Sequence, residues 1–462
     1  MARMMGMRPL IGRTTELARL RRAADEAPQL VVIRGRRRVG KSFLINHAYA
    51  DAKRFIYFQA DEGGERLHLD LLSAECARLS GAPVAFADWN VALEYVRRLA
   101  EDAPLVLALD EFQWMWLAQD ALPSILMRHF DAWQRDGVRV CLVIAGSELT
   151  MMERLVEGDR PLFGRAAARP LIEPFDYRLA AEFGPARASA EDRLRRYAIL
   201  GGTPQYQVWA GRGDVASVLK ERILPPGESL SEEPLQLLRG ERGLRDPGAY
   251  FEVLQAIAQG RTQFNEIAQA TASSATNALA ARLTRLEELG YIAHRVPVAG
   301  NGTRSYAIKD PYFRFWFRFV APNRSRLQGG RVDEVYDDIV HALDDFMGAS
   351  FEAVCQRWAR TYAPRDSVFA TAPEIGAYWN RTHSVEVDLV AMAKRKVLAL
   401  GSCKWSATAD AHVLDRLIEH RAAIAGGGNP ELFVFARGFH RTLTKRANAG
   451  EVTLVSAQDL YA

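Results

Sequence analysis

The chain has few cysteines, no long apolar run and no strong charge of either sign. Only four cysteines occur in 462 residues, and none forms a CxxC pair, which argues against a disulfide framework or a zinc knuckle. The longest apolar runs, such as residues 105–109, are far too short to span a bilayer. The N-terminus carries no apolar core of signal-peptide length. We therefore expect a cytoplasmic protein with no membrane partner.

The overall composition is that of a folded globular protein. Apolar residues make up 48% of the chain and charged residues 25%. The net charge of +4 is too small to predict a nucleic-acid partner, so any basic surface must be local. The length allows about three domains of the usual size.

The most informative stretch is residues 31–46, which read VVIRGRRRVGKSFLIN. It predicts a strand, a glycine-bounded loop and a helix, the arrangement that cradles phosphates. Lys41 can reach the β- and γ-phosphates, and the Ser42 hydroxyl can ligate Mg²⁺. The stretch therefore predicts ATP or ADP as ligand and Mg²⁺ as metal. The residues assigned to the nucleotide here are Gly35, Val39, Gly40, Lys41, Ser42 and Phe43.

A second stretch, residues 104–111, predicts a buried parallel strand that ends in two acids. Ligands of open α/β sheets collect at the carboxyl edge, so these acids are expected beside the phosphates. Asp110 would belong to the Mg²⁺ shell, and Glu111 would orient and polarise the attacking water. The alternative is that both acids only cap a strand or a helix.

Two further catalytic candidates follow the next predicted strand, residues 138–145. Ser147 is placed to sense the γ-phosphate or the water, and it is also a plausible helix N-cap. Arg165 could reach a neighbour's γ-phosphate as an arginine finger in a homo-oligomer, or form an ordinary surface salt bridge. The strand–helix alternation from Gly12 to about Pro174 predicts a parallel sheet with helices on both faces.

The middle of the chain predicts two helical parts. The pattern of residues 177–238 predicts helices, and a Gly-Gly-Thr-Pro turn at 201–206 interrupts them. In a helical lid this turn would bring Pro204 to the nucleotide; otherwise it is an ordinary interhelical loop. Three helical patterns and a β-hairpin then predict a winged helix. Their ranges are 250–259, 263–269, 276–289, 292–298 and 304–308.

The predicted winged helix has two interpretations. Its third helix carries Arg282 and Arg285, and its hairpin carries Arg295 and Arg304, which would allow docking on DNA. The alternative is an intramolecular spacer or a protein-contact module, since glutamates share the third helix. The aromatic stretch at residues 310–317 is predicted to form core or an interdomain seam.

Several motifs together resemble the archaeal-type ATPase family. They are GRRRVGKS, ALDEFQW, IAGS, PLFGR, LGGTPQY, KDPYFRFWFRFVAPN and EVDLVAMAKRKVLALGSCKW. Members of this family are AAA- and STAND-related P-loop proteins with a C-terminal domain similar to restriction-endonuclease-like PD-(D/E)xK nucleases. The resemblance covers almost the whole chain and implies ATP binding, hydrolysis and a role on DNA. It predicts an α/β fold with a P-loop core (1–176), a helical lid (177–240), a winged helix (241–325) and a nuclease-like domain (326–462).

The resemblance also assigns a set of residues in the tail. Asp388 matches the first metal-binding acid of such nucleases, Lys404 matches their lysine, and Glu352 matches the helical acid. Two residues before Lys404, the nuclease pattern has glutamate, but this chain has Ser402, whose hydroxyl does not neutralise a divalent cation. Glu386 lies on the same strand face as Asp388 and is a substitute. We therefore expect a domain that keeps the fold to hold DNA or protein rather than to cut.

The sequence thus favours an ATP-driven molecular switch. Two rivals stay open at this point, an ATP-regulated DNA nuclease and a non-hydrolysing signalling scaffold that responds to bound nucleotide.

Overall fold

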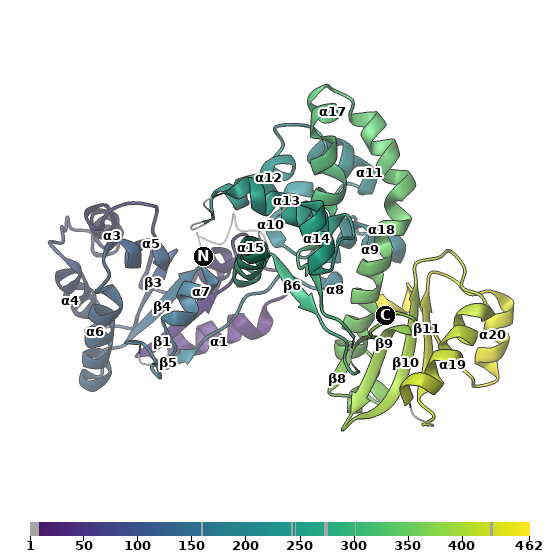
Figure 1. Cartoon of the computed structure of the whole chain (residues 1–462). Helices are drawn as coiled ribbons and strands as arrows, with labels where there is room; N and C mark the ends of the chain where they lie inside the picture. The colour runs from purple at the N-terminus through teal and green to yellow at the C-terminus, as the bar shows by residue number, and fades with distance from the viewer. Residues whose placement is uncertain are drawn as a thin grey trace. The chain divides into compact units, whose positions relative to one another are not determined.

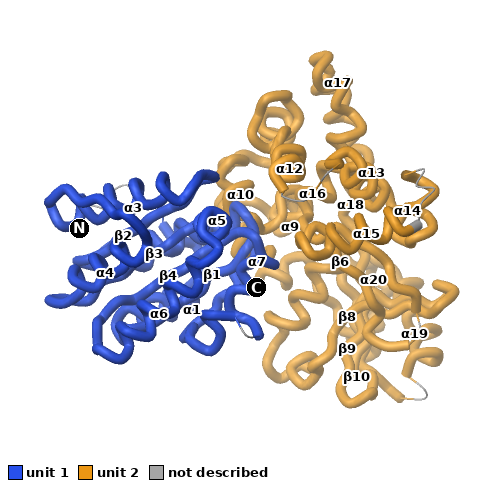
Figure 2. The backbone as a smooth tube through the Cα atoms, turned by 60° about the vertical axis from the view of Figure 1, so that its left-hand side comes forward, with its two compact units in different colours: residues 1–174 blue, residues 175–462 orange. Residues whose placement is uncertain are grey.

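The computed structural model describes residues 9–158, 160–241, 244, 246–271, 276–300, 302–425 and 428–462. The chain forms two compact units, residues 1–174 and 175–462 (Figure 2). The first unit spans residues 1–174, whereas the ATPase core is predicted for residues 1–176, and this domain assignment stays a prediction. The three further predicted parts all lie in the second unit, so the boundaries between them stay predictions.

The first unit is built on a five-stranded, all-parallel sheet in the order β2-β3-β4-β1-β5. Every residue of β3 and β4 is buried, as expected for continuous aliphatic strands covered on both faces. The predicted parallel sheet is confirmed, but β5 was not predicted, because three alanines carry no strand signal. The strands are β1 (Gln29–Arg34), β2 (Phe55–Gln59), β3 (Leu105–Asp110), β4 (Val140–Gly146) and β5 (Ala166–Ala168).

Helices cover both faces of this sheet (Figure 1). Alternate residues of each strand point to opposite faces, so Val31 and Ile33 pack against α1 and α2, whereas Leu30 and Val32 join the core formed with α3 to α7. The helices are α1 (Thr14–Asp25), α2 (Lys41–Ala48), α3 (Glu65–Ser80), α4 (Trp89–Leu99), α5 (Phe112–Ala118), α6 (Leu122–Asp136) and α7 (Leu149–Arg154).

The second unit begins with the helices predicted for residues 177–238. Tyr177 joins these helices to the end of the chain, because its hydroxyl donates a 2.5 Å hydrogen bond to the Leu460 carbonyl. Residues of α9 pack in the same core as α18 and the C-terminal sheet. The helices are α8 (Tyr177–Ala181), α9 (Ala190–Leu200), α10 (Pro204–Ala210), α11 (Val215–Val218), the π-helix η2 (Leu219–Ile223) and α12 (Ser229–Arg239).

Three helices and a two-stranded antiparallel hairpin follow in the predicted order. The first strand ends at Arg295, earlier than predicted, because the chain then turns to the C-terminal sheet, where the Val298 N–H donates to the Ala377 carbonyl. The assignment as a winged helix stays a prediction. The elements are α13 (Pro247–Ala258), α14 (Phe264–Ala270), α15 (Thr276–Glu288), β6 (Ile292–Arg295) and β7 (Ser305–Ile308).

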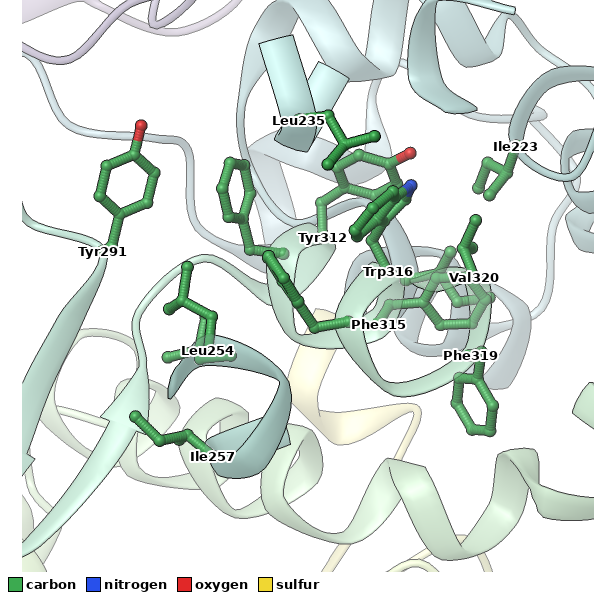
Figure 3. Packing of buried hydrophobic residues seen from close by; sticks show 14 of the residues in the cluster. Ile223, Leu235, Leu254, Ile257, Tyr291, Tyr312, Phe315, Trp316, Phe319 and Val320 are labelled. Carbon is green, nitrogen blue, oxygen red and sulfur yellow. The ribbon is translucent and has the colours of Figure 1, made fainter. Parts of the chain in front are cut away.

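The aromatic stretch forms core, as predicted. It folds into α16 (Pro311–Phe315) and the π-helix η3 (Trp316–Val320), and Figure 3 shows its side chains packed among leucines and isoleucines of neighbouring helices. The Trp316 indole is fully buried and donates to the Ser231 carbonyl at 2.8 Å. Burying each such ring contributes roughly 1.5–3 kcal/mol, so this segment holds the helical part of the unit together.

The unit ends in a mixed five-stranded sheet in the order β12-β11-β10-β9-β8. Strands β10, β11 and β12 run parallel to one another, and β9 is antiparallel to both β8 and β10. The helix α18 covers one face, and α19 with α20 covers the other. The elements are α18 (Val332–Thr361), β8 (Glu374–Trp379), β9 (Glu386–Ala393), β10 (Lys396–Lys404), α19 (Ala411–Ala425), β11 (Glu431–Ala436), α20 (Arg441–Asn448) and β12 (Thr453–Ser456).

In the sequence, Gly329-Gly330 and the polar residues up to about 338 predict a linker, and this prediction is wrong for most of its length. The helix α18 already begins at Val332, and Val335, Ile339 and Leu343 are buried at helical spacing in the main core of the unit. The acidic residues of this segment are exposed, and such a polar sequence is also typical of a solvated linker. None of the described helices is long and apolar enough to cross a bilayer.

Candidate nucleotide site

The loop between β1 and α2 requires glycine at both of its ends. A Cβ atom at Gly35 would lie 2.6 Å from the Ile172 carbonyl oxygen, closer than van der Waals contact permits. Gly40 has φ 93°, in the left-handed region that other residues rarely adopt. The backbone can therefore turn tightly here and direct its N–H groups inward, as a phosphate cradle requires.

Lys41, the first residue of α2, is directed into this loop. Its side chain is buried, and its Nζ donates to the carbonyl oxygens of Gly35 at 2.9 Å and Arg36 at 3.1 Å. Burial lowers the pKa of the Lys41 ammonium, and the negative charges of Glu111 and Asp110 oppose that shift. A positive charge is thus held at the centre of the cradle by neutral acceptors, which an anionic phosphate would outcompete.

Asp110, at the end of β3, collects three hydrogen bonds. Its carboxylate accepts from the Ser42 hydroxyl at 2.5 Å, from the Tyr57 hydroxyl at 2.7 Å and from the Glu111 N–H at 2.9 Å. Protein sites usually hold Mg²⁺ through one or two oxygens, with phosphates and waters completing the shell. The adjacent Ser42 and Asp110 oxygens fit that requirement.

Tyr57 was not predicted from the sequence. It lies in β2, whose register against β3 places Gln59 opposite Asp110 and Tyr57 opposite Ala108. Burial and the charge of Asp110 raise the pKa of the Tyr57 phenol, which keeps it a proton donor at neutral pH. An aromatic residue near the end of a strand next to the acidic strand is the only sequence signal for this contact.

Glu111 is held by two polar side chains from neighbouring elements. The Ser147 hydroxyl donates to its carboxylate at 2.7 Å, and the Gln113 amide donates to both the same carboxylate and the Ser147 hydroxyl. The strand β4 lies between β1 and β3, so Ser147, just after β4, lies between the cradle and the acids. Ser147 is not a helix cap, because α7 begins at Leu149 with Glu148 as its N-cap. Gln113 was not predicted.

Glu111 also has an unusual backbone conformation, with φ 52°. Non-glycine residues in this region cost free energy and persist where the surroundings fix them, often at functional sites. The Glu111 carboxylate is held by Ser147 and Gln113, and such contacts are surroundings of this kind.

Arg165 forms the salt bridge that the sequence left open as an alternative. Its Nε and Nη2 contact the two carboxylate oxygens of Asp131 at 2.6 and 2.9 Å, and its Nη1 donates to the Pro161 carbonyl at 2.9 Å. The hydrogen bond to Asp131 raises the pKa of Arg165. The arginine-finger role stays a prediction and requires this pair to open.

Three other residues assigned to the nucleotide lie in different surroundings. Val39 is buried in the core beside α1 and α2, whereas Phe43 is partly exposed and stacks on His47. Pro204 is the first residue of α10, in the second unit. Their contacts with a nucleotide stay predictions.

The residues assigned in the tail partly converge. The Asp388 carboxylate accepts from the Cys403 N–H at 2.7 Å and the Ser402 hydroxyl at 3.2 Å, and it lies 3.5 Å from the Lys404 Nζ. Burial, together with the charge of Asp388, raises the pKa of Glu352 to about 7. Asp388, Lys404 and Glu352 therefore influence one another electrostatically.

Glu386 does not join this group. Its exposed carboxylate pairs with His383 in the turn between β8 and β9, because a residue at the strand end can bend toward the turn. The expectation that Glu386 replaces the missing acid stays a prediction. Across the described ranges, no group of three or more His, Cys, Asp or Glu side chains is arranged to hold a metal ion.

Comparison with known families gives two matches. Residues 10–208 match the model described as an ATPase domain predominantly from Archaea. Residues 316–414 match a model described as archaeal and bacterial proteins of unknown function. An uncharacterized protein of Methanocaldococcus jannaschii is 25% identical over 409 residues, which cover 87% of this chain and 89% of that protein.

Two solved structures align with a large part of the chain. A Walker-type ATPase of Pyrococcus abyssi aligns with a TM-score of 0.52 and 21% identity, covering 67% of this chain and 96% of its own. The ORC2 protein of Aeropyrum pernix, solved as ADPNP–ADP complexes, has a TM-score of 0.44 and 14% identity, with 73% and 96% covered. Only the first likeness bears on the fold. Together with the match over residues 10–208, it supports an archaeal-type P-loop ATPase domain.

Proposed function

We propose that the chain is a Mg²⁺-dependent ATPase that acts as a molecular switch. The observation that carries this proposal is the contact between the first residues of α2 and the end of β3, where the Ser42 hydroxyl lies 2.5 Å from the Asp110 carboxylate. In this proposal the phosphate-binding loop, the metal-binding oxygens and the acid that directs the water lie together at one edge of the sheet, as phosphoryl transfer requires.

The residues have distinct roles in this proposal. Lys41 binds the β- and γ-phosphates, and Ser42 with Asp110 holds the metal ion, which supplies positive charge against the phosphates. Glu111 orients the attacking water, and Ser147 with Gln113 fixes the position of its carboxylate. Hydrogen bonds that hold a catalytic group in place reduce the reorganisation needed during the reaction.

The cradle is also joined to the chain segment that leads into the second unit. The Arg34 N–H donates to the Pro170 carbonyl at 3.0 Å, and the Ile172 N–H donates to the Arg34 carbonyl at 2.7 Å. The Ile172 carbonyl in turn leaves no room for a side chain at Gly35. A change in the loop on phosphate binding would therefore move a segment that ends at the junction of the two units, residue 174.

A steady-state ATPase assay tests this proposal. We expect the purified chain to release phosphate from ATP in the presence of Mg²⁺ and to stop when EDTA is added, because the metal neutralises charge in the transition state. The assay is run with and without duplex DNA, which also tests the coupling to DNA. ATP binding without phosphate release under any of these conditions would favour the signalling scaffold instead.

DNA binding through the hairpin receives less support than an intramolecular role. Arg285 pairs with Glu288 at 3.0 Å, and Arg295 pairs with Glu352 at 3.4 Å. The hairpin itself is bound to β8, as the Val298 N–H donates to Ala377 and the Trp379 indole donates to Thr303. We propose that these three helices and the hairpin serve mainly to organise the second unit, and that any contact with duplex DNA comes from other surfaces.

A nuclease is the second candidate function, because Asp388, Lys404 and Glu352 converge as described. The unmodified chain should cut DNA slowly or not at all, because the Ser402 hydroxyl supplies no negative charge to hold a divalent ion. We expect Ser402→Glu to introduce Mg²⁺- or Mn²⁺-dependent nicking of plasmid DNA, measured on agarose gels.

Two further variants make that prediction specific. The nicking by Ser402→Glu should disappear when Asp388→Ala or Lys404→Ala is added. Robust cleavage by the unmodified chain that Glu386→Ala abolishes would contradict this account, because it would show that Glu386 supplies the acid.

A further inference from the structure

A cleft of about 800 Å³ lies in the second unit between the β6–β7 hairpin, α18 and β8. Its charged lining is unbalanced, with more guanidinium groups than carboxylates, so the cleft is expected to attract anions. The charged residues that line it are Arg295, Arg314, Arg318, Arg360, Asp345 and Glu352.

Arg314 is a largely buried arginine of the cleft lining. Its Nη2 donates to the Ser350 hydroxyl, and its guanidinium lies 4.5 Å from the centre of the Phe346 ring. Its Nε is buried and has no hydrogen-bond partner among the described residues. Burial lowers the pKa of Arg314 to about 10, so it stays charged at neutral pH. The guanidinium thus keeps one buried donor unpaired, which costs free energy.

Arg295 faces the same space from the hairpin. Its Nη2 lies 3.4 Å from the Glu352 carboxylate, the nearest competing acceptor. An anion that enters the cleft would compete with this carboxylate for Arg295.

Aromatic rings complete the lining. His294 and Tyr306 have ring centroids 4.5 Å apart, and the Arg295 guanidinium lies 5.8 Å from the Trp379 ring. Aromatic faces stack on nucleobases, and arginines beside them pair with the attached phosphate. A cleft that has both arginines and aromatic rings therefore favours a nucleotide over a simple inorganic anion as its ligand.

The size of the cleft limits what enters it. On one side the hairpin is fixed to β8 by the Val298–Ala377 hydrogen bond of 2.9 Å and the Trp379–Thr303 hydrogen bond of 2.8 Å. The volume falls within the roughly 300–1,000 Å³ of small-molecule sites. A DNA duplex is too wide for such a space.

We propose that this cleft binds a phosphorylated nucleoside, either as a free nucleotide or as the phosphorylated end of a single strand. Arg295, Arg314 and Arg318 would pair with the phosphate, and the aromatic rings would face the base. The site is separate from the ATP cradle, and the proposal does not depend on ATP hydrolysis.

Calorimetric titration of the full chain tests this inference. The chain carries Lys41→Ala, so that the cradle contributes little to the signal. The probes are AMP, ADP, a 5′-phosphorylated thymidine dinucleotide and the same dinucleotide without the phosphate. We expect the phosphorylated probes to bind, and the unphosphorylated dinucleotide to bind at least tenfold more weakly because it cannot pair with the arginines. Preference for AMP and ADP or for the phosphorylated dinucleotide identifies the source of the ligand.

Removing an arginine charge and removing a glutamate charge should change the affinity in opposite directions. This comparison distinguishes an electrostatic effect on binding from a loss of folded protein. Arg314→Gln and Arg318→Gln should each weaken binding about tenfold, whereas Glu352→Gln should strengthen it several-fold by removing the competitor of Arg295. Arg365 is exposed and lies outside the cleft. Arg365→Gln also removes one positive charge, and it should leave the affinity unchanged. Thermal unfolding confirms that each variant is folded, and the exposed Arg318 keeps the test valid if Arg314→Gln is unstable. Absence of binding at millimolar AMP, ADP and phosphorylated dinucleotide, or affinities that these variants do not change, would overturn the proposal.

Discussion

Glu111→Gln should bind ATP as well as the parent chain and lose on the order of 10²-fold or more of its turnover. The substitution keeps the shape of the side chain and an oxygen that can accept from Ser147, whose hydroxyl lies 2.7 Å from the carboxylate. It removes the negative charge that polarises the attacking water. Phosphate release measures turnover, and equilibrium titration with a fluorescent ATP analogue measures binding.

A matched control distinguishes this effect from a general loss of charge. Glu157 is an exposed acid of the same unit, and Glu157→Gln should retain the parent rate. If Glu111→Gln hydrolysed ATP at the parent rate, the assignment of Glu111 as the acid that directs the water would be wrong. Loss of both binding and turnover would mean instead that the substitution disturbs the strained backbone at φ 52°.

The sequence predicted the frame of the nucleotide site because its signals are local. Gly35, Gly40, Lys41 and Ser42 lie within one loop and the start of one helix, and Asp110 ends a strand whose apolar run is unambiguous. Parallel strands bring their carboxyl ends to the same edge, so the general meeting of loop and acids follows from topology alone. The structure confirms the parallel sheet.

The contacts that complete the site could not be predicted, because they depend on the register between strands and on side-chain direction. Tyr57 reaches Asp110 only because β2 lies beside β3 in a particular register. Gln113 reaches Ser147 across 34 positions of the chain. Neither pairing leaves a periodic pattern in the sequence, so the order of residues alone does not specify it.

In the second unit, prediction failed where local composition disagreed with tertiary packing. The acidic turn at residues 333–338 resembled a linker, yet it belongs to α18 because its apolar residues are buried. Tertiary burial outweighs local polarity in such a case. The helix α20 and the strand β12 were also missed, since the first has a strongly polar sequence and the second is only four residues long.

Lys41→Ala should weaken nucleotide binding itself, by on the order of 10²-fold. A charge-assisted hydrogen bond to phosphate contributes roughly 1.5–3 kcal/mol, and this lysine is the buried cation at the centre of the loop. Because its ammonium also donates to the carbonyls of Gly35 and Arg36, the substitution loosens the loop as well. Titration with a fluorescent ATP analogue measures the loss, and phosphate release should fall in parallel at subsaturating ATP.

Two comparisons make the result specific to the cradle. Lys53→Ala removes the same charge from an exposed position of the same unit and should leave affinity unchanged, because a solvated lysine makes no contact with phosphate. In Lys41→Ala, the affinity for ATP should fall more than the affinity for adenosine, since only the phosphates meet the ammonium. Equal losses for ATP and adenosine would indicate that the substitution unfolds the loop, and an unchanged ATP affinity would show that the nucleotide binds elsewhere.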